Sequence, residues 1–176
     1  MRILFVTTVN PVDRTTGGEI ATDNIVAGLK AAGNIVDVLF YSRANSKRYY
    51  NECISVADRQ IEYSDSLLQT SLWFLKSLVI KRAFSTTKYV TGKYKRKLIK
   101  TLRKNTYDAI FIDHAQMAWV MEFLPCSVRM YFISHNVESN IYNEISGGNN
   151  GIKRYIYKRE ARLIGRDERH ISKVSV

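Results

Sequence analysis

The fold of this chain is decided by ILFVTTVNPVDRTTGGEIATDNIVAGLKAAG (residues 3–33). A short apolar run is followed by a turn-rich segment, the pair Gly17-Gly18 and a helical pattern over residues 19–32. Glycine lets a ligand approach the backbone closely. The start of the next helix offers unpaired N–H groups and the positive end of a dipole. This order of strand, loop, glycine pair and helix therefore predicts a phosphate-binding loop. The alternative is a turn that contains glycine but binds no ligand.

Strands and helices alternate along the rest of the chain. We expect strands at residues 2–8, 35–41, 107–114, 128–134 and 171–176, with a short one near 60–63. We expect helices at residues 19–32, 66–84, 88–104, 115–124, 137–145 and 152–169. This alternation predicts one α/β domain over residues 1–176, a doubly wound, mostly parallel Rossmann-like sheet with helices on both faces.

Polar residues gather where these parallel strands end, which is where such sheets bind ligands. Besides Gly17-Gly18, they are His114 and the pair His135-Asn136, so two of the three histidines lie at strand ends. A neutral imidazole can donate to phosphate or sugar oxygens and titrates near neutrality. Alternatively, Asn136 caps the following helix and both histidines satisfy only local hydrogen bonds. Glu19 is expected to stabilise the first helical turn.

The composition is strongly basic, with a formal net charge of +11 in 176 residues. Such a charge favours an anionic partner, whether nucleic acid, a membrane surface or a phosphorylated substrate. The two cysteines, Cys53 and Cys126, are far apart and form neither a disulfide framework nor a metal-ligand pattern. We therefore expect a reducing, cytoplasmic location and no metal. The N-terminus lacks a secretory signal pattern.

A basic tract lies between residues 66 and 107, which hold eleven Lys or Arg and no Asp or Glu. Its first half is an apolar helix around Trp73, and its second half is crowded with cations. Together they predict a surface that docks on an anionic membrane or on a substrate molecule of the protein. The alternatives are a core helix with a solvated charged face, and nucleic acid, for which no recognised motif is present. The predicted surface consists of Trp73, Lys93, Lys95, Arg96, Lys97 and Lys100.

Several common motifs are missing. The chain has no G-x-G-x-x-G, no G-x-x-x-x-G-K-[ST] and no G-x-S-x-G, which disfavours a dinucleotide cofactor, a P-loop nucleotidase and an α/β-hydrolase. It also has no D-x-D pair and no zinc-ligand spacing. We expect no cofactor.

A set of segments resembles the N-terminal domain of GT-B glycosyltransferases, particularly the retaining family 4. The segments are RILFV (2–6), GGE (17–19), GLKAAG (28–33), VDV (36–38), YDAIFIDH (107–114), ISHNVE (133–138) and ISKVS (171–175). The last is similar to the strand that precedes the family's interdomain crossing. Asn34 departs from the histidine that is frequent in the family after this glycine. The resemblance spans nearly the whole chain but only half of such an enzyme.

The resemblance implies a nucleotide-sugar donor as substrate and a glycan or lipid-linked acceptor, in surface polysaccharide synthesis. Gly17 and Gly18 would approach the donor diphosphate, and His135 would act at the transferred sugar or its phosphate. A donor-binding domain would follow Val176, so we expect no turnover from this chain alone. Glu160 and Glu168 have the family's E-x7-E spacing, but they precede the expected crossing and are interpreted as a coincidence. A non-catalytic binding module with a basic docking surface is the alternative.

Overall fold

The computed structural model describes residues 1–42, 53–57 and 66–174, and all statements below concern these residues. Five parallel strands form one sheet in the order β3-β2-β1-β4-β5. The strands are β1 (Arg2–Val6), β2 (Ile35–Ser42), β3 (Cys53–Ala57), β4 (Ala109–Asp113) and β5 (Arg129–Ile133). The order reverses at β1, which confirms the doubly wound α/β fold.

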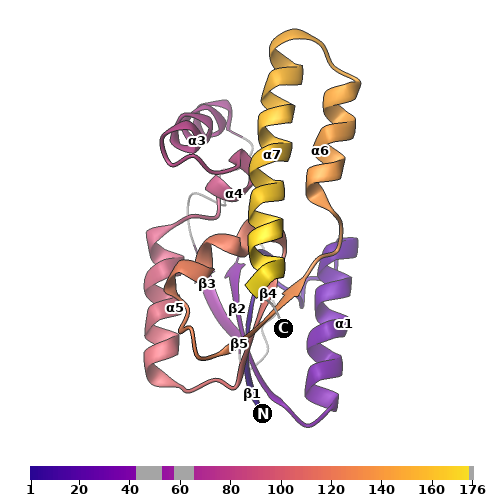
Figure 1. The fold of residues 1–176 in the computed structure, drawn as a ribbon. Helices are drawn as coiled ribbons and strands as arrows, with labels where there is room; N and C mark the ends of the chain where they lie inside the picture. Colours follow the sequence, from indigo (N-terminus) through magenta and orange to yellow (C-terminus); the bar gives the residue numbers. More distant parts are fainter. Residues whose placement is uncertain (43–52, 58–65, 175–176) are drawn as a thin grey trace.

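The central strand β1 shows why this sequence forms a buried parallel sheet. The side chains of Ile3, Leu4, Phe5 and Val6 are all fully buried, as expected for a strand covered on both faces. Leu4 and Val6 pack towards α5 (Gly92–Lys104) and the 3-10 helix η1 (Ala115–Phe123). Ile3 and Phe5 pack towards α1 (Gly17–Ala31) on the opposite face. Figure 1 shows α5 and α1 on opposite sides of the sheet.

The remaining helices extend beyond the sheet. α6 (Glu138–Gly147) and α7 (Gly151–Val174) form a long antiparallel hairpin, with α3 (Leu67–Val79) and α4 (Phe84–Thr87) beside α7 (Figure 1). None of the helices in the described ranges is long and apolar enough to cross a membrane.

The expected elements differ from the structure at the strand 171–176, at β3 and at residues 85–87, which lie between two expected helices but belong to α4 (Phe84–Thr87). The strand expected at residues 171–176 is wrong, because α7 continues to Val174 and Ile171 is fully buried in the core beside η1. Ala161, Ile164 and Ile171 are all buried on this helix at helical spacing, so packing overrides the β-like alternation of this segment. The strand β3 was not predicted. The short strand expected near residues 60–63 lies outside the described residues.

Candidate functional site

Asp113, the last residue of β4, is the centre of the candidate site. Its side chain is fully buried, and Oδ2 accepts hydrogen bonds from the hydroxyls of Thr7 (2.7 Å) and Thr22 (2.8 Å). Thr7 follows β1 and Thr22 lies on α1. A buried carboxylate has to be satisfied by donors, and here those donors join the ends of two strands to the helix that follows the first.

His135, two residues after β5, provides a further donor to Asp113. Its Nε2 lies 2.7 Å from Asp113 Oδ1, and 20% of its side chain is exposed. This hydrogen bond raises the pKa of His135 above the usual 6.5, because the carboxylate stabilises the protonated ring. Since Nε2 is engaged, Nδ1 is the nitrogen that can meet a ligand.

His114 adjoins the same carboxylate in a strained backbone conformation. Its φ of 72° with ψ of 138° is rare for any residue but glycine. Nδ1 lies 3.0 Å from Asp113 Oδ1, close enough for charge attraction but without hydrogen-bond geometry. The ring meets that of His135 edge-on, with 4.7 Å between centroids. Burial lowers the pKa of His114, so the neutral ring is favoured.

The start of α1 completes this cluster. A Cβ added to Gly18 would lie 3.8 Å from His114 Nε2. Neither Gly17 nor Gly18 has a positive φ, so these glycines leave open space beside the backbone rather than allow a special conformation. Their N–H groups lie in the first turn, and no hydrogen bond to protein atoms uses them among the described residues.

Glu19 has the structural role expected of it. Thr16 and Glu19 form a capping box, in which Glu19 Oε2 accepts from the backbone N–H groups of Thr15 (2.7 Å) and Thr16 (2.9 Å). The carboxylate therefore satisfies the preceding turn and stabilises the positive end of α1.

Asn136 is exposed and is not held in this cluster by any hydrogen bond of its side chain within the described ranges. It does not cap the next helix either, because α6 begins at Glu138 with Val137 at its N-cap. Glu168 of α7 caps α6 instead, accepting from the N–H of Glu138 (2.7 Å) and the hydroxyl of Ser139 (2.6 Å).

Glu160 has the matching role at α4. Its carboxylate accepts from the N–H groups of Phe84 and Ser85, both at 2.7 Å, and from the Ser85 hydroxyl. The E-x7-E pair of Glu160 and Glu168 therefore caps two different helices, α4 and α6.

The predicted docking surface is only partly at the surface. Lys93, Lys95, Arg96, Lys97 and Lys100 are exposed on α5. Trp73 is not, because only 3% of its surface is accessible and its ring packs against Phe84, 6.4 Å between centroids. The prediction for Trp73 was wrong because α3 turns its aromatic side inward and its leucines outward.

Sequence reasoning missed Asp113, which organises both histidines, together with Thr7 and Thr22. The available signal was an acidic residue at the end of an otherwise apolar strand. Asp113, His114 and His135 are also a group that could hold a metal ion, since one ligand atom of each lies within 4.8 Å of the others. The short His135–Asp113 hydrogen bond would have to open for a metal to enter.

Comparisons with known proteins identify no family for this chain. No protein-family model matches the chain, and no curated protein matches its sequence. Among solved structures, the chain is similar to sucrose-phosphate synthase from Thermosynechococcus elongatus, with a TM-score of 0.47 and 12% sequence identity. The match covers 99% of this chain and 45% of that one, so the chain spans less than half the length of that structure. A score and an identity this low do not establish a family.

Proposed function

We propose that this chain is the acceptor-side half of a retaining glycosyltransferase and that the Asp113 cluster binds the phosphates of its nucleotide-sugar donor. The cluster consists of Asp113, His114 and His135, with Gly17 and Gly18 beside it. The observation that carries the proposal is one buried carboxylate hydrogen-bonded to His135, with a second imidazole, His114, beside it and next to helix N–H groups that no protein acceptor uses among the described residues. Helix starts and imidazolium groups both favour phosphate oxygens.

The two histidines suit different tasks because their surroundings shift their pKa values in opposite directions. In many active sites, two titratable groups whose pKa values are shifted apart take different roles. When it is protonated, a form that the raised pKa of its ring favours, His135 can donate from Nε2 to Asp113 and from Nδ1 to a phosphate oxygen. Transfer of the sugar leaves negative charge on the diphosphate, and a fixed donor at that position stabilises the transition state.

His114 is suited to orientation. Its neutral ring lies against Gly18, so a group bound to the N–H groups of α1 would meet His114 Nε2 as well. The strained backbone holds the ring in this place, and strain of this kind persists only where the surrounding structure imposes it.

The proposed transferase needs a second domain. Glu160 and Glu168, which have the spacing of a donor-site pair, are used here as helix caps. We therefore expect this chain to bind phosphates but to transfer no sugar on its own. Sugar transfer by the isolated 176-residue chain would contradict the half-enzyme proposal.

Binding can be tested by NMR of the imidazole C–H groups, because the chain has only three histidines. Titration with UDP, ADP, GDP and inorganic pyrophosphate should shift His114 and His135 saturably. His170, exposed on α7, should not respond and serves as the internal control. Shifts confined to His170, or none at millimolar diphosphate, would exclude the site.

A matched pair of variants separates the site from general charge effects. His135→Ala should weaken diphosphate binding roughly ten- to hundredfold, since a hydrogen bond to a charged group contributes about 1.5–3 kcal/mol. His170→Ala removes the same side chain from α7 and should leave the affinity unchanged. Equal losses in both variants would indicate nonspecific attraction to a basic protein.

A non-catalytic binding module remains the second candidate, favoured by the five exposed cations on α5. It predicts that Lys97→Glu/Lys100→Glu weakens anion binding more than His135→Ala does. The transferase proposal predicts the reverse order.

A further inference from the structure

Helix α3 presents an apolar side to solvent. Leu68, Leu72, Leu75 and Val79 follow one another at helical spacing, and 79%, 58%, 58% and 80% of their surfaces are accessible. The buried residues of this helix are Trp73 and Ser77, on the opposite side. A surface helix normally turns its polar side outward, and a contiguous exposed apolar patch marks an interaction site. We call these four side chains the α3 face.

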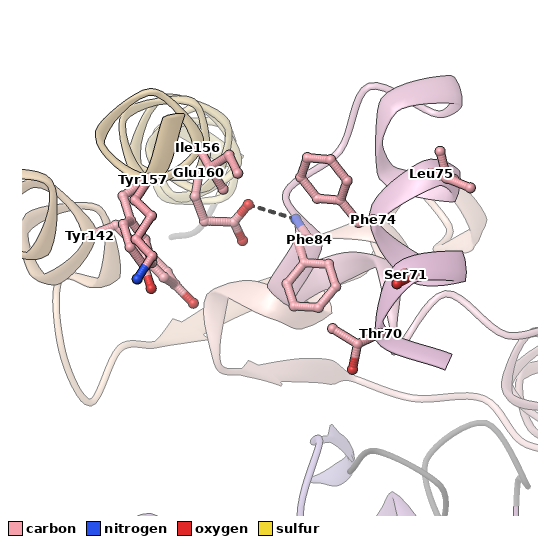
Figure 2. A pocket seen from close by; sticks show the side chains of 10 residues that line it. Thr70, Ser71, Phe74, Leu75, Phe84, Tyr142, Ile156, Tyr157 and Glu160 are labelled. Atoms are coloured by element: carbon pink, nitrogen blue, oxygen red, sulfur yellow. Dashed lines mark hydrogen bonds between the residues drawn. The ribbon is translucent and has the colours of Figure 1, made fainter. Parts of the chain in front are cut away.

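A groove adjoins the α3 face. It has a volume of about 580 Å³ and lies between α3 and the α6–α7 hairpin. Figure 2 shows Phe74 and Phe84 on one side of it, with Tyr142, Ile156 and Tyr157 on the other. Leu75 belongs to both the groove lining and the α3 face, so the two apolar surfaces are continuous.

Glu160 is the only acid that lines the groove among the described residues, and its carboxylate is engaged by α4. Both of its oxygens accept hydrogen bonds from α4, at 2.7 Å each, and the residue is 4% exposed. A groove of this size with apolar walls and few polar groups is suited to a hydrocarbon chain.

The first half of α7, which forms one wall of the groove, is basic. Lys153 lines the groove, and Arg154 and Lys158 are exposed on the same half of the helix. Ile152 and Tyr155 lie among these cations with 79% and 73% of their surfaces accessible. The sequence has no Asp or Glu between residues 145 and 159 or between 66 and 107. Apolar and aromatic side chains set among cations, without acids, are typical of elements that lie on anionic lipid.

We propose that the α3 face, the groove and the first half of α7 bind the surface of an anionic membrane, with one lipid hydrocarbon chain in the groove. Charge complementarity favours this occupant over a second copy, because a second copy of this chain, with a formal net charge of +11, would bring no excess of negative charge. The attachment is peripheral, through side chains of helices that do not span the bilayer. It is independent of the Asp113 cluster.

Vesicle flotation tests the attachment with the full chain and no nucleotide. The chain should float with vesicles of phosphatidylcholine containing 30% phosphatidylglycerol, less so at high salt, and not with phosphatidylcholine alone. Leu72→Asp/Leu75→Asp should reduce binding at least tenfold. Both positions are more than half exposed, and circular dichroism should show an unchanged fold. Equal binding to neutral vesicles, or none to anionic ones, would overturn the proposal.

Two charge-matched variants locate the docking surface. Lys153→Glu/Lys158→Glu on α7 should weaken vesicle binding more than Lys97→Glu/Lys100→Glu on α5, although both change the net charge equally. A larger loss from the α5 variant would overturn the proposal and favour the surface expected from the sequence. Light scattering checks the competing occupant: a dimer that Leu72→Asp/Leu75→Asp dissociates would show that a second copy covers the α3 face.

The two tryptophans test whether a chain enters the groove. Trp73 packs on Phe84, which lines the groove, whereas Trp119 is buried beside Tyr94 under α5. With lipids brominated on their acyl chains, fluorescence of Trp119→Phe, which retains Trp73, should be quenched. The fluorescence of Trp73→Phe, which retains Trp119, should not be quenched. Equal quenching of both variants, or of neither, would exclude a chain in the groove.

Because these assays contain no nucleotide, their failure leaves the diphosphate titration unaffected. Failure of that titration likewise leaves vesicle binding unaffected. Each proposal can therefore be rejected without the other.

Discussion

The Asp113 cluster and the α3 face both depart from the usual distribution of side chains, in which charged groups are exposed and apolar groups are buried. In the cluster a carboxylate is fully buried, and on α3 a row of leucines is more than half exposed. The buried charge is satisfied inside the chain, by two threonine hydroxyls and His135. No comparable partner covers the exposed leucines among the described residues, and the membrane proposed above would cover them. The first region should therefore dominate stability, and the second should dominate attachment.

The largest expected effect is that of Asp113→Ala on stability. The change leaves the hydroxyls of Thr7 and Thr22 without their acceptor and His135 without its counter-charge. Removing one partner of a buried charged pair costs about 3–5 kcal/mol. Chemical denaturation with urea should report a loss of this size in the free energy of unfolding.

Asp108→Ala is the matched control for that measurement. Asp108 is exposed and accepts one hydrogen bond, from the N–H of Arg2 at 2.6 Å. We expect a loss of about 1 kcal/mol or less. Equal losses at the two aspartates would mean that the cluster is not a buried network.

The next largest difference in the free energy of unfolding is expected between two neighbouring residues of α3. Trp73→Ala should cost about 3–5 kcal/mol of unfolding free energy, as expected for a buried aromatic side chain. Leu72→Ser, one position earlier, should change it by no more than about 0.5 kcal/mol. Thermal or urea unfolding of both variants checks this. A large loss for Leu72→Ser would show that the α3 face is packed rather than exposed.

The two acidic caps of α7 should differ by a smaller margin. Glu160→Ala leaves buried N–H groups of α4 without an acceptor and should cost about 2–3 kcal/mol. Glu168→Ala frees groups at the start of α6 that are only partly buried, where water can replace the carboxylate, and should cost about 1 kcal/mol. Urea unfolding of the two variants should give this order, and the reverse order would contradict the burial argument.

The smallest effect is the pH dependence that the two histidines confer. The pKa of His135 is raised in the folded chain, so its stabilising contribution is fully present below the unfolded pKa of about 6.5 and is lost as pH rises through the folded pKa. The stability that His135→Gln loses should therefore be larger near about pH 5.5 than near about pH 8.5.

His114 should show the opposite sign. Its pKa is lowered by burial, so the folded state resists protonation and its contribution is lost as pH falls. His114→Gln should therefore relieve part of the acid destabilisation that wild type shows. NMR titration of the two imidazoles gives the pKa values directly. A pKa of His114 above that of His135 would contradict the assignment.

Much of the fold followed from local patterns. The continuous apolar run at residues 3–6 could only be a strand buried on both faces, and the strand–helix alternation implied a parallel sheet. The two histidines at strand ends could also be placed, because the carboxyl ends of parallel strands share one edge. The role of Asp113 could not, since its donors come from Thr7 and Thr22, which are about 100 residues away in the chain.

The sequence by itself determined four of the five strands, most of the helices and the excess of positive charge, because these depend on spacing and composition within short segments. The tertiary structure alone decided which side of α3 is buried, that Ile171 continues a helix, and that one carboxylate binds His135 and lies beside His114. These outcomes depend on which surfaces remain uncovered after distant segments pack, and on donors that meet only in the folded chain.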